Sequence, residues 1–377
     1  MDTGRQTFRP TEARIDLGAV VHNVRALGAL TPAGTAFMAV VKADAYGHGA
    51  VPVARAARDA GASWFGVALL EEALELRGAG LSEPVLVLGA VPASAAPAAV
   101  GAGVRLALFD PDLARALDAA ARGRGRPARV HLKIDTGMGR VGVRPEDLPA
   151  FLDLLGTLPG VEVEGVFTHF ATADETDLSF ARNQLERFHR CLELLSHRGV
   201  RPRIRHAANT AGILALPESH LDLVRAGIGL YGIYPSDEVV RSADLRPVLR
   251  WTTRIAHLKD VPPGTPLSYG RTHVTPGPRR IATLPVGYGD GYPRLLSNRG
   301  AVLVRGRRAP VVGRVCMDMI LVDVTEVPGA EPGDEVVLLG RQGEEEIPAD
   351  ELARLTGTIP YEITCNVGKR VPRRLEG

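Results

Sequence analysis

Four lysines stand out in a chain whose other basic residues are all arginine. They are Lys42, Lys133, Lys259 and Lys369, among 45 basic residues in total. For each lysine the question is therefore whether an arginine could replace it, and Lys42 and Lys133 are the candidates for a role that a guanidinium cannot take, such as losing a proton to become a nucleophile. Lys42 ends the apolar run AFMAVVK and Lys133 ends RVHLK, and a glycine-bearing loop follows each. We interpret Lys42 as a functional amine, with a salt bridge at the rim of the fold as the alternative.

Tyrosine and histidine side chains add candidate acids and bases. Four of the seven tyrosines directly precede glycine, which suits rings presented from loops: Tyr46, Tyr231, Tyr269 and Tyr288. Tyr269 lies in the loop PPGTPLSYGRTHVTPGP, where a functional ring and an exposed turn are both expected. His169 and His206 are either functional or hydrogen-bonded core histidines. Neither has a partner at metal-ligand spacing, so no metal site is expected.

Apolar runs with strand character must position these groups. Eight runs alternate with segments of helical period, after an opening helix near 18–30. The runs are 36–41, 63–68, 84–88, 104–109, 129–134, 161–168, 203–207 and 221–225. Eight βα repeats favour an α/β fold with a closed parallel (β/α)8 barrel, the TIM barrel, over an open sheet.

Reactive groups of such a barrel lie at the carboxyl ends of its strands. Five runs end in segments that contain ionisable or hydrogen-bonding side chains: VVKADAYGHG, HLKIDTGMGR, FTHFATADE, RHAANTAG and VRAGIGLYG. The loops after the seventh and eighth strands commonly bind phosphate, and donors are available there from Asn209, Thr210, Gly227 and Ile228. A lysine together with a phosphate cradle suggests pyridoxal 5'-phosphate as the cofactor, because its Schiff base needs a primary amine.

The segment TGMGRVG at 136–142 also matches the glycine pattern of dinucleotide-binding loops. That fingerprint requires a helix to begin at once after the first strand. Here Arg144 and Pro145 interrupt the segment, which follows the fifth strand. A nicotinamide site is therefore not expected.

The pattern changes beyond about residue 245. Short β-type runs joined by Pro/Gly turns follow, at 251–258, 280–284, 301–305, 310–315, 320–324 and 335–339. We predict two domains, a cofactor-binding barrel over 1–245 and a mostly β domain over 246–377.

Composition excludes several classes of function. A hydrophobic content of 45% and a net charge of +2 are typical of a well-packed globular protein without a general attraction to nucleic acid or anionic membrane. Three scattered cysteines do not form a disulfide framework. The uncharged stretch 84–104 contains three prolines and is not expected to span a membrane. The polar N-terminal segment lacks a signal-peptide pattern, so a cytoplasmic location is expected.

Eight ordered segments resemble the motif set of alanine racemase, a pyridoxal-phosphate enzyme of fold type III. They are AVVKADAYGHG, HLKIDTGMGRVGV, FTHFATADE, VRAGIGLYG, SYGRTH, LPVGYGDGYPR, VCMDM and IPYEITC. The resemblance runs over nearly the whole chain. It implies interconversion of L-alanine and D-alanine, supplying D-alanine for cell-wall peptidoglycan. It also implies a homodimer in which the second domain of each subunit covers the partner's barrel mouth.

The resemblance further implies roles for single residues. Racemisation needs two bases, one on each face of the cofactor, and these are Lys42, which also holds the cofactor, and Tyr269 from the partner subunit. Arg225 faces the pyridine nitrogen, and His169 and Arg225 form a chain of contacts that favours the tyrosinate. The cofactor phosphate is bound by Tyr46, Tyr361, Asn209, Thr210, Gly227 and Ile228. The substrate is bound by Arg140 and the backbone at Met317, with Tyr288 and Tyr361 narrowing the entrance.

Arg225 indicates which type of pyridoxal-phosphate reaction is expected. A guanidinium cannot give the ring nitrogen a proton, so it favours proton transfer over decarboxylation or transamination, for which an acidic residue is expected. A non-enzymatic pyridoxal-phosphate carrier would not need a second domain. A racemase of broader specificity, acting on serine or larger amino acids, stays open, because one methylene is worth only about 1–3 kcal/mol of discrimination.

Lys133 lies shortly before Arg140 in the sequence, and two cations converging on one carboxylate site repel. In part of the resembled family the equivalent lysine is carbamylated by carbon dioxide, which turns the competing cation into an anion that orients the arginine. The alternative is an ordinary lysine paired with Asp135.

Overall fold

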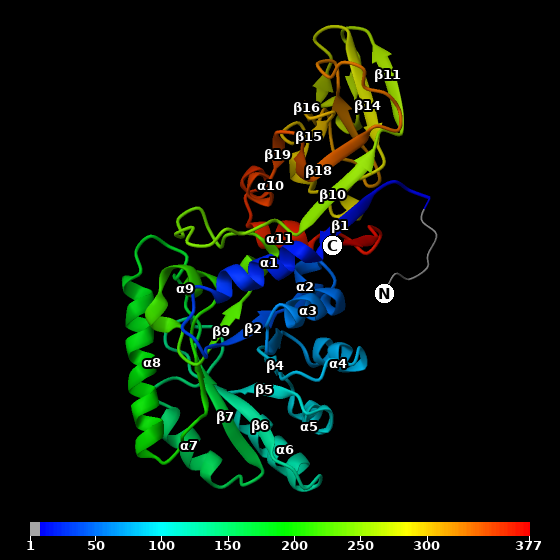
Figure 1. Ribbon diagram of the computed structural model, residues 1–377. Coiled ribbons are helices and arrows are strands. Elements are labelled where there is room, and N and C mark those ends of the chain that lie inside the picture. Colours follow the sequence, from blue (N-terminus) through cyan, green and yellow to red (C-terminus); the bar gives the residue numbers. More distant parts are fainter. Residues whose placement is uncertain (1–7) are drawn as a thin grey trace. The chain divides into compact units, whose positions relative to one another are not determined.

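A computed structural model describes residues 8–377 and divides the chain into two compact units (Figure 1). The barrel unit comprises Val20–Ala45 and Ala50–Arg246. The sheet unit comprises the described residues up to Ala19, the tetrapeptide Tyr46–Gly49, and Pro247–Gly377. The sheet unit is thus assembled from three separate stretches of sequence.

Eight parallel strands form the barrel unit. In order of pairing they are β8 (Ile204–His206), β7 (Val161–Phe167), β6 (Ala128–Lys133), β5 (Arg105–Leu108), β4 (Val85–Val87), β3 (Trp64–Val67), β2 (Ala36–Val40) and β9 (Leu223–Ala226). Backbone hydrogen bonds from Asp222 N to Arg205 O and from Arg225 N to Ala208 O connect the two end strands. The barrel is therefore nearly closed, and the predicted TIM-barrel fold with its eight strands is confirmed.

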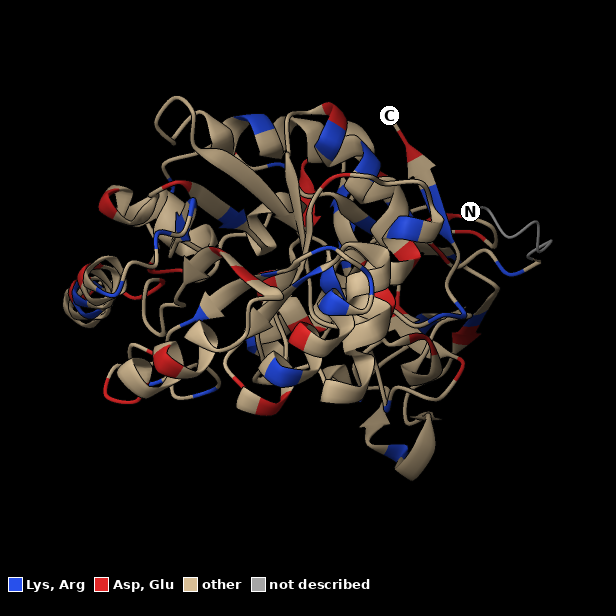
Figure 2. Cartoon of the chain, turned by 90° about the horizontal axis from the view of Figure 1, so that it is seen from below, with Lys and Arg blue, Asp and Glu red and all other residues tan. Residues whose placement is uncertain are grey.

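Helices follow the strands and cover the barrel (Figure 1). They are α1 (Leu17–Gly28), α2 (Lys42–Gly47), α3 (Ala50–Asp59), α4 (Leu70–Gly78), α5 (Ala96–Ala102), α6 (Pro111–Arg122), α7 (Leu148–Gly156), α8 (Ser179–His197) and α9 (Thr210–Ala215). Local signals set their ends; α6, for example, begins where Asp110 accepts a hydrogen bond from Leu113 N and Pro111 needs no partner for an amide hydrogen. Acidic and basic residues are interspersed along the helices (Figure 2).

Two sheets and a short hairpin form the sheet unit. The larger sheet has the order β16 (Arg307–Pro310), β15 (Ala301–Val304), β18 (Glu335–Gln342), β10 (Leu249–Arg254), β1 (Glu12–Asp16) and β20 (Arg373–Glu376), with β19 (Glu345–Ile347) paired to β18. The smaller sheet contains β11 (His257–Val261), β14 (Arg279–Leu284) and β17 (Ile320–Asp323). The hairpin pairs β12 (Pro266–Leu267) with β13 (His273–Val274). Two helices complete the unit, α10 (Ala349–Thr356) and α11 (Pro360–Cys365). The predicted mostly β C-terminal fold is confirmed.

Two predicted strands of this unit are wrong in detail. The run 251–258 is two strands, because β10 pairs with β18 while β11 pairs with β14 in the other sheet. The run 310–315 is mainly a loop, since β16 ends at Pro310 and Gly313 takes a φ of +79°. Strand β1 was not predicted; its buried residues are only Ala13 and Ile15, and it is completed by pairing with β10 and β20, which lie far away in the sequence.

In the part of the chain that the structure describes, no helix combines the length and the apolar character needed to span a membrane.

Candidate active site

Lys42 is presented by an unusual backbone turn. It lies two residues after the end of β2 and begins α2, and the next four residues all have positive φ, from 51° at Ala43 to 54° at Tyr46. The short helix is therefore left-handed. This hand costs L-residues roughly 1–2 kcal/mol each, so neighbouring groups must hold the turn in place. No sequence pattern predicted it, because left-handed turns have no characteristic periodicity.

Glu72 on α4 holds the start of this turn. Its Oε1 accepts a hydrogen bond from Ala43 N at 2.6 Å, while Oε2 accepts from Ala68 N at 2.7 Å and Leu69 N at 3.0 Å. One carboxylate therefore ties the segment after Lys42 to the loop after β3. The sequence analysis missed this residue, because LEEALELR shows only an ordinary helix with acidic residues in its first turn.

Arg225 is a buried cation in the interior of the barrel. Its side chain, on β9, is 3% exposed. Nη2 donates to the carbonyl oxygens of Thr168 at 2.9 Å and Ala207 at 2.8 Å, and Nη1 donates to His206 Nδ1 at 2.9 Å. His169 Nδ1 accepts from Nη2 at 3.2 Å. Burial lowers the pKa of Arg225 to about 9, which still leaves the guanidinium charged at neutral pH.

Further cations surround His169 near the strand ends. Burial lowers the pKa of Lys133 to about 8, and the charges of Arg140, Arg225 and Lys42 lower it as well. Burial, followed by the same three charges and that of Lys133, holds the pKa of His169 well below its ordinary value. His169 is therefore neutral at pH 7. These mutual effects place Lys42, Lys133, His169 and Arg140 in one region, whose positive charge favours anionic ligands.

Lys133 and Asp135 do not form the ion pair that was considered for them. Asp135 Oδ1 instead accepts hydrogen bonds from Gly137 N and Gly139 N, each at 3.0 Å, and no ion pair joins Asp135 to Lys133 within residues 8–377. The Lys133 Nζ lies 5.4 Å from the centre of the Phe167 ring. Asp135 thus shapes the glycine loop that carries Arg140. Its charge raises the pKa of Lys133, but no carboxylate of residues 8–377 lies within ion-pair distance of the amine.

Thr210 organises the predicted phosphate cradle. Its buried Oγ1 accepts hydrogen bonds from Gly227 N at 2.9 Å and Gly229 N at 3.3 Å. A hydroxyl oxygen has two lone pairs and one proton, so the O–H of Thr210 remains available as a donor. Ile228 begins the turn between these two glycines. Asn209 Oδ1 accepts from Gly212 N at 2.9 Å and caps α9, and the predicted contact of Asn209 with phosphate stays a prediction.

Two predicted phosphate ligands meet within the sheet unit. The rings of Tyr46 and Tyr361 have centroids 6.0 Å apart at an angle of 49°. Burial raises the pKa of Tyr46, so its phenol stays protonated and can donate a hydrogen bond. Gly47, with a φ of +85°, packs so closely on the Thr364 carbonyl of α11 that a Cβ would collide with it. This contact explains why Tyr46–Gly49 belongs to the sheet unit.

Tyr288 and Met317 are also brought together within the sheet unit. Tyr288 N donates to Cys316 O at 3.0 Å, and Gly289 N donates to Met317 O at 2.9 Å. The two segments approach so closely that a Cβ at Gly287 would collide with both carbonyl groups. Both side chains are exposed.

Tyr269 stands on a strained loop with 70% of its surface exposed. Its neighbours Ser268 and Gly270 have φ values of +59° and +69°, and Ser268 combines this φ with a ψ of −176°, a region that only glycine adopts readily. The Ser268 hydroxyl donates to Arg314 O at 2.6 Å and holds the turn. The loop therefore presents an exposed ring in a fixed position.

The cluster in the barrel unit lacks the composition of a metal centre. Among residues 8–377 no group of three or more His, Cys, Asp or Glu side chains is placed to hold a metal ion. A buried arginine, neutral histidines, two lysines and the Thr210 hydroxyl instead suit anionic ligands.

Comparison with known proteins identifies the family. The family model of the alanine racemase N-terminal domain matches residues 15–235, and that of the C-terminal domain matches residues 248–375. The chain belongs to the alanine racemase family. The resemblance of its motifs is thereby confirmed, and so is its activity as an isomerase of the alanine racemase type, acting on an amino acid.

Similar proteins cover the chain from end to end. The alanine racemase of Symbiobacterium thermophilum is 54% identical over 97% of both chains. Among solved structures, the alanine racemase from D-cycloserine-producing Streptomyces lavendulae is 42% identical with a TM-score of 0.94, covering 99% of this chain and 98% of that one. The alanine racemase of Bartonella henselae, solved with covalently bound pyridoxal phosphate, is 30% identical with a TM-score of 0.88, covering 97% and 99%.

We predict that Glu72→Gln loosens the turn of Lys42. The amide group cannot accept hydrogen bonds at its NH2, so at least one of three backbone donors loses its partner, which costs about 1–3 kcal/mol. Amide hydrogen exchange at Ala43 should accelerate, and the urea midpoint should fall. Glu71→Gln, on the exposed neighbouring residue, is the matched control and should change neither. Equal exchange rates in both variants would show that Glu72 does not hold the turn.

Proposed function

We propose that the chain interconverts L-alanine and D-alanine with pyridoxal 5'-phosphate held on Lys42. The observation that carries this proposal is the pairing of an amine with a phosphate cradle on adjacent strands. Strands β2 and β9 are neighbours, with Ala39 opposite Ala226. Lys42 and Gly227 follow these two residues closely in the sequence, and the Thr210 hydroxyl lies beside Gly227. An amine and phosphate donors therefore lie at the same end of the barrel.

The residues present fit this cofactor. When bound, pyridoxal phosphate acts as an electron sink that makes the α-hydrogen of an amino acid acidic. In the barrel unit the Thr210 O–H is a donor for a phosphate oxygen, and Gly227, whose N–H the Thr210 hydroxyl accepts, and Ile228 lie beside it. Family resemblance adds Tyr46, with its protonated phenol, and Tyr361 to the phosphate ligands. Arg225 holds a positive charge in the barrel interior and has no proton to give at neutral pH. This limits the site to moving a proton at the α-carbon.

The substrate is held by its carboxylate. Arg140 and the backbone N–H of Met317 bind it in this proposal, and Tyr288, which is adjacent to Met317, limits the size of the side chain. Alanine is therefore favoured over serine or larger amino acids, in agreement with the names of the relatives. The supply of D-alanine for peptidoglycan and the cytoplasmic location stay predictions.

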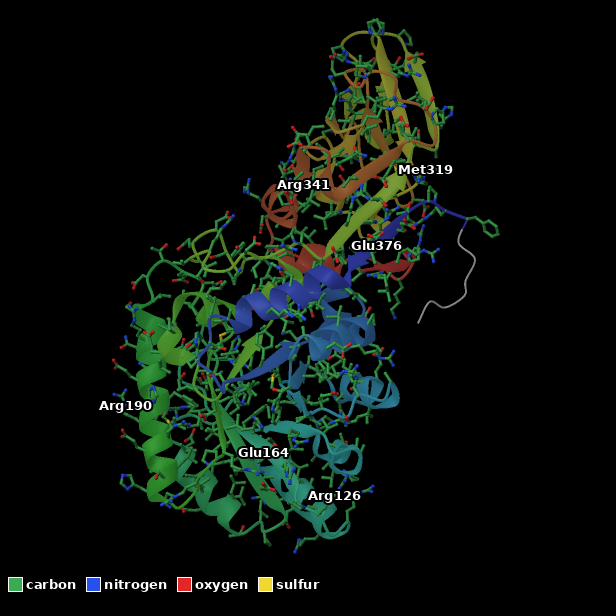
Figure 3. All side chains as sticks on the ribbon, in the orientation of Figure 1. Arg126, Glu164, Arg190, Met319, Arg341 and Glu376 are labelled. Carbon is green, nitrogen blue, oxygen red and sulfur yellow. The ribbon has the colours of Figure 1, made fainter. Side chains whose placement is uncertain are left out.

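Two bases move the proton, one on each face of the substrate. Lys42 takes or returns it on one face. Tyr269 acts on the other, and family resemblance assigns it to the partner subunit of a homodimer. The exposed apolar side chains of the sheet unit support such an assembly, because large apolar groups in contact with water favour association. They include Tyr269, Tyr288, Leu295, Met317, Met319 and Ile359 (Met319 is labelled in Figure 3).

We predict that borohydride reduction of the purified yellow protein fixes the cofactor on Lys42. Reduction converts a Schiff base into a stable amine that survives proteolysis. Mass spectrometry of the peptides should find the pyridoxyl group on Lys42, and Lys42→Ala should lose both the label and the visible absorbance. A label on Lys133, Lys259 or Lys369 would reject the assignment.

The shared active site predicts recovery of activity in mixed dimers. Tyr269→Phe should bind the cofactor yet lose racemisation, and should impair α-proton exchange of one enantiomer far more than of the other. Lys42→Ala should also be inactive. A heterodimer of the two variants contains one site with both bases intact, so mixing should restore part of the activity. A mixture proven to contain heterodimer but without activity would refute the shared site.

Lys133 is proposed to carry a carbamate. Its neutral amine forms an N–C bond to carbon dioxide and releases one proton, so only the unprotonated form reacts. A pKa of about 8 makes roughly one amine in ten neutral at pH 7, far more than at the ordinary lysine pKa of 10.5. The product is an anion beside Arg140, which removes the repulsion between two cations.

Labelled bicarbonate tests the carbamate. At constant dissolved carbon dioxide, a 13C carbamate resonance should grow as the pH rises through about 8, because the neutral amine fraction grows. Lys133→Met should lack it, while Lys259→Met, at an exposed position on β11, should retain it. A resonance that persists in Lys133→Met, or that is absent from the unmodified sequence, would contradict carbamylation of Lys133.

A further inference from the structure

A row of buried polar groups extends from Arg225 into the barrel. Arg225 Nη1 contacts His206 Nδ1 at 2.9 Å, and His206 Nε2 contacts His131 Nδ1 at 2.7 Å. His131 Nε2 then lies 3.8 Å from Glu164 Oε2. The two histidines are fully buried, and Glu164 is 5% exposed. Figure 3 labels Glu164 within the barrel unit.

An irregularity in β7 places Glu164 in this row. Val130 of β6 is opposite Val163, but the next residue, His131, is opposite Gly165, so Glu164 is an extra residue in the strand. Such a β-bulge redirects a side chain at little cost to the rest of the sheet. Glycine at position 165 leaves space for the His131 ring, since a Cβ there would lie 2.6 Å from His131 Nδ1. The strand is thus shaped so that the Glu164 carboxylate is the anion facing His131 Nε2, at 3.8 Å, a buried nitrogen without a hydrogen-bond partner within residues 8–377.

Arg225 at one end of the row and Glu164 at the other determine which nitrogen of each histidine carries the proton, which we call the proton order of the row. Arg225 is only a donor, so His206 Nδ1 must be a bare acceptor and Nε2 must carry the proton. His206 then donates to His131 Nδ1, which leaves the proton of His131 on Nε2, facing Glu164. The opposite order would set two N–H groups against each other at Arg225 and would turn a lone pair of His131 toward the carboxylate.

The buried positive charge of Arg225 explains why a row of polar groups leads from it to a carboxylate. Within residues 8–377 the hydrogen-bond partners of Arg225 are two carbonyl groups and two histidines, with no carboxylate among them. A buried cation without a counter-ion is costly. Burial holds the pKa of His131 and of His206 below the ordinary value, and His206 well below it, so both remain neutral acceptors. Glu164 is the anion at the far end of the row, and Phe167, stacked 4.7 Å from the His206 ring, keeps that ring in plane.

An ordinary structural role for Glu164 is the competing explanation. Arg105 Nε donates to Glu164 Oε2 at 2.8 Å, and Arg129 and Arg203 lie within 4 Å of Oε1. His131 and Arg105 hold the pKa of the Glu164 carboxyl low, at about 2, against the opposing effect of burial. If these ion pairs were its whole purpose, the state of His206 would not depend on Glu164.

We propose that Glu164 is a positioning residue that acts through His131 and His206 to keep the acceptor nitrogen of His206 turned toward Arg225. The carboxylate stabilises the N–H on His131 Nε2, which keeps His131 Nδ1 available to His206 and fixes the proton order of the whole row. The Arg225 guanidinium is thereby held in one orientation at the site. Its effect on the cofactor rests on the proposed function, whereas the proton order does not.

The proton order is measured by 15N magic-angle-spinning NMR of the full-length protein with its histidines labelled. The His131–His206 pair is recognised by coupling across its N–H···N hydrogen bond, the single one between two histidines among residues 8–377. Both histidines should be neutral, with the proton on Nε2 and none on Nδ1. A proton on Nδ1 of either ring, or a doubly protonated His206, would overturn the proposal.

Variants of β7 test whether Glu164 sets the tautomers of the two histidines or only forms ion pairs with arginines. Glu164→Gln removes the anion and can turn an N–H donor toward His131, so the Nδ1 and Nε2 resonances of both rings should shift toward a mixture of tautomers. Glu162→Gln removes a carboxylate of the same strand that pairs with Arg129 and Arg203, and it should leave the row unchanged. Identical histidine spectra in the two variants would refute the role of Glu164. Glu164→Asp keeps the charge and should retain the single tautomer, which provides a test if Glu164→Gln does not fold.

Binding of pyridoxal phosphate provides the second measurement. Glu164→Gln should raise its dissociation constant by about tenfold or more, as loss of a supporting partner does at other cofactor sites, whereas Glu162→Gln should stay within about twofold. Equal affinities in the two variants would contradict the positioning role at the cofactor. If the unmodified protein bound no pyridoxal phosphate, the proposed function would fail, while the NMR result would still decide the proton order.

Discussion

The burial of the Arg225 guanidinium is the constraint on which the barrel interior depends. A permanent cation away from water must have every partner in place, and those partners must be acceptors. Thr168 and Ala207 supply carbonyl groups from the ends of two strands, and His206 supplies a ring nitrogen that has to stay neutral. The polar side chains of β6, β7 and β8 are arranged around this requirement, in a barrel whose other interior groups are mainly apolar.

Backbone strain is a second feature of the candidate site residues. It occurs next to both predicted bases. Lys42 begins a left-handed turn held by Glu72, and Tyr269 follows Ser268, whose backbone conformation normally requires glycine. Such conformations persist only where surrounding contacts outweigh them. In both cases hydrogen bonds from outside the strained segment provide those contacts, so a reactive side chain is presented in a single position.

Residue type singled out most of the candidate site residues. Lys42 and Lys133 stood out because arginine fills nearly all other basic positions, and the strand ends supplied Thr210 and Gly227 as candidate phosphate ligands. The eight barrel strands were predictable because buried parallel strands are apolar along their length. Glu72 and Glu164 were not, because an acidic residue in a helix or strand has no local feature that separates an internal ligand from a solvated side chain.

The sequence by itself determined which reactive side chains follow which strands, since strand order and the residues after each strand are local properties of the chain. Only the tertiary structure decided how those groups are held. The bulge that admits Glu164 depends on the register between β6 and β7, and the tetrapeptide Tyr46–Gly49 joins the sheet unit through its contact with α11. Strand β1 likewise forms because β10 and β20 pair with it. Each of these features arises from contacts between distant segments, whose hydrogen bonds and packing outweigh the weak preferences of any short stretch of sequence.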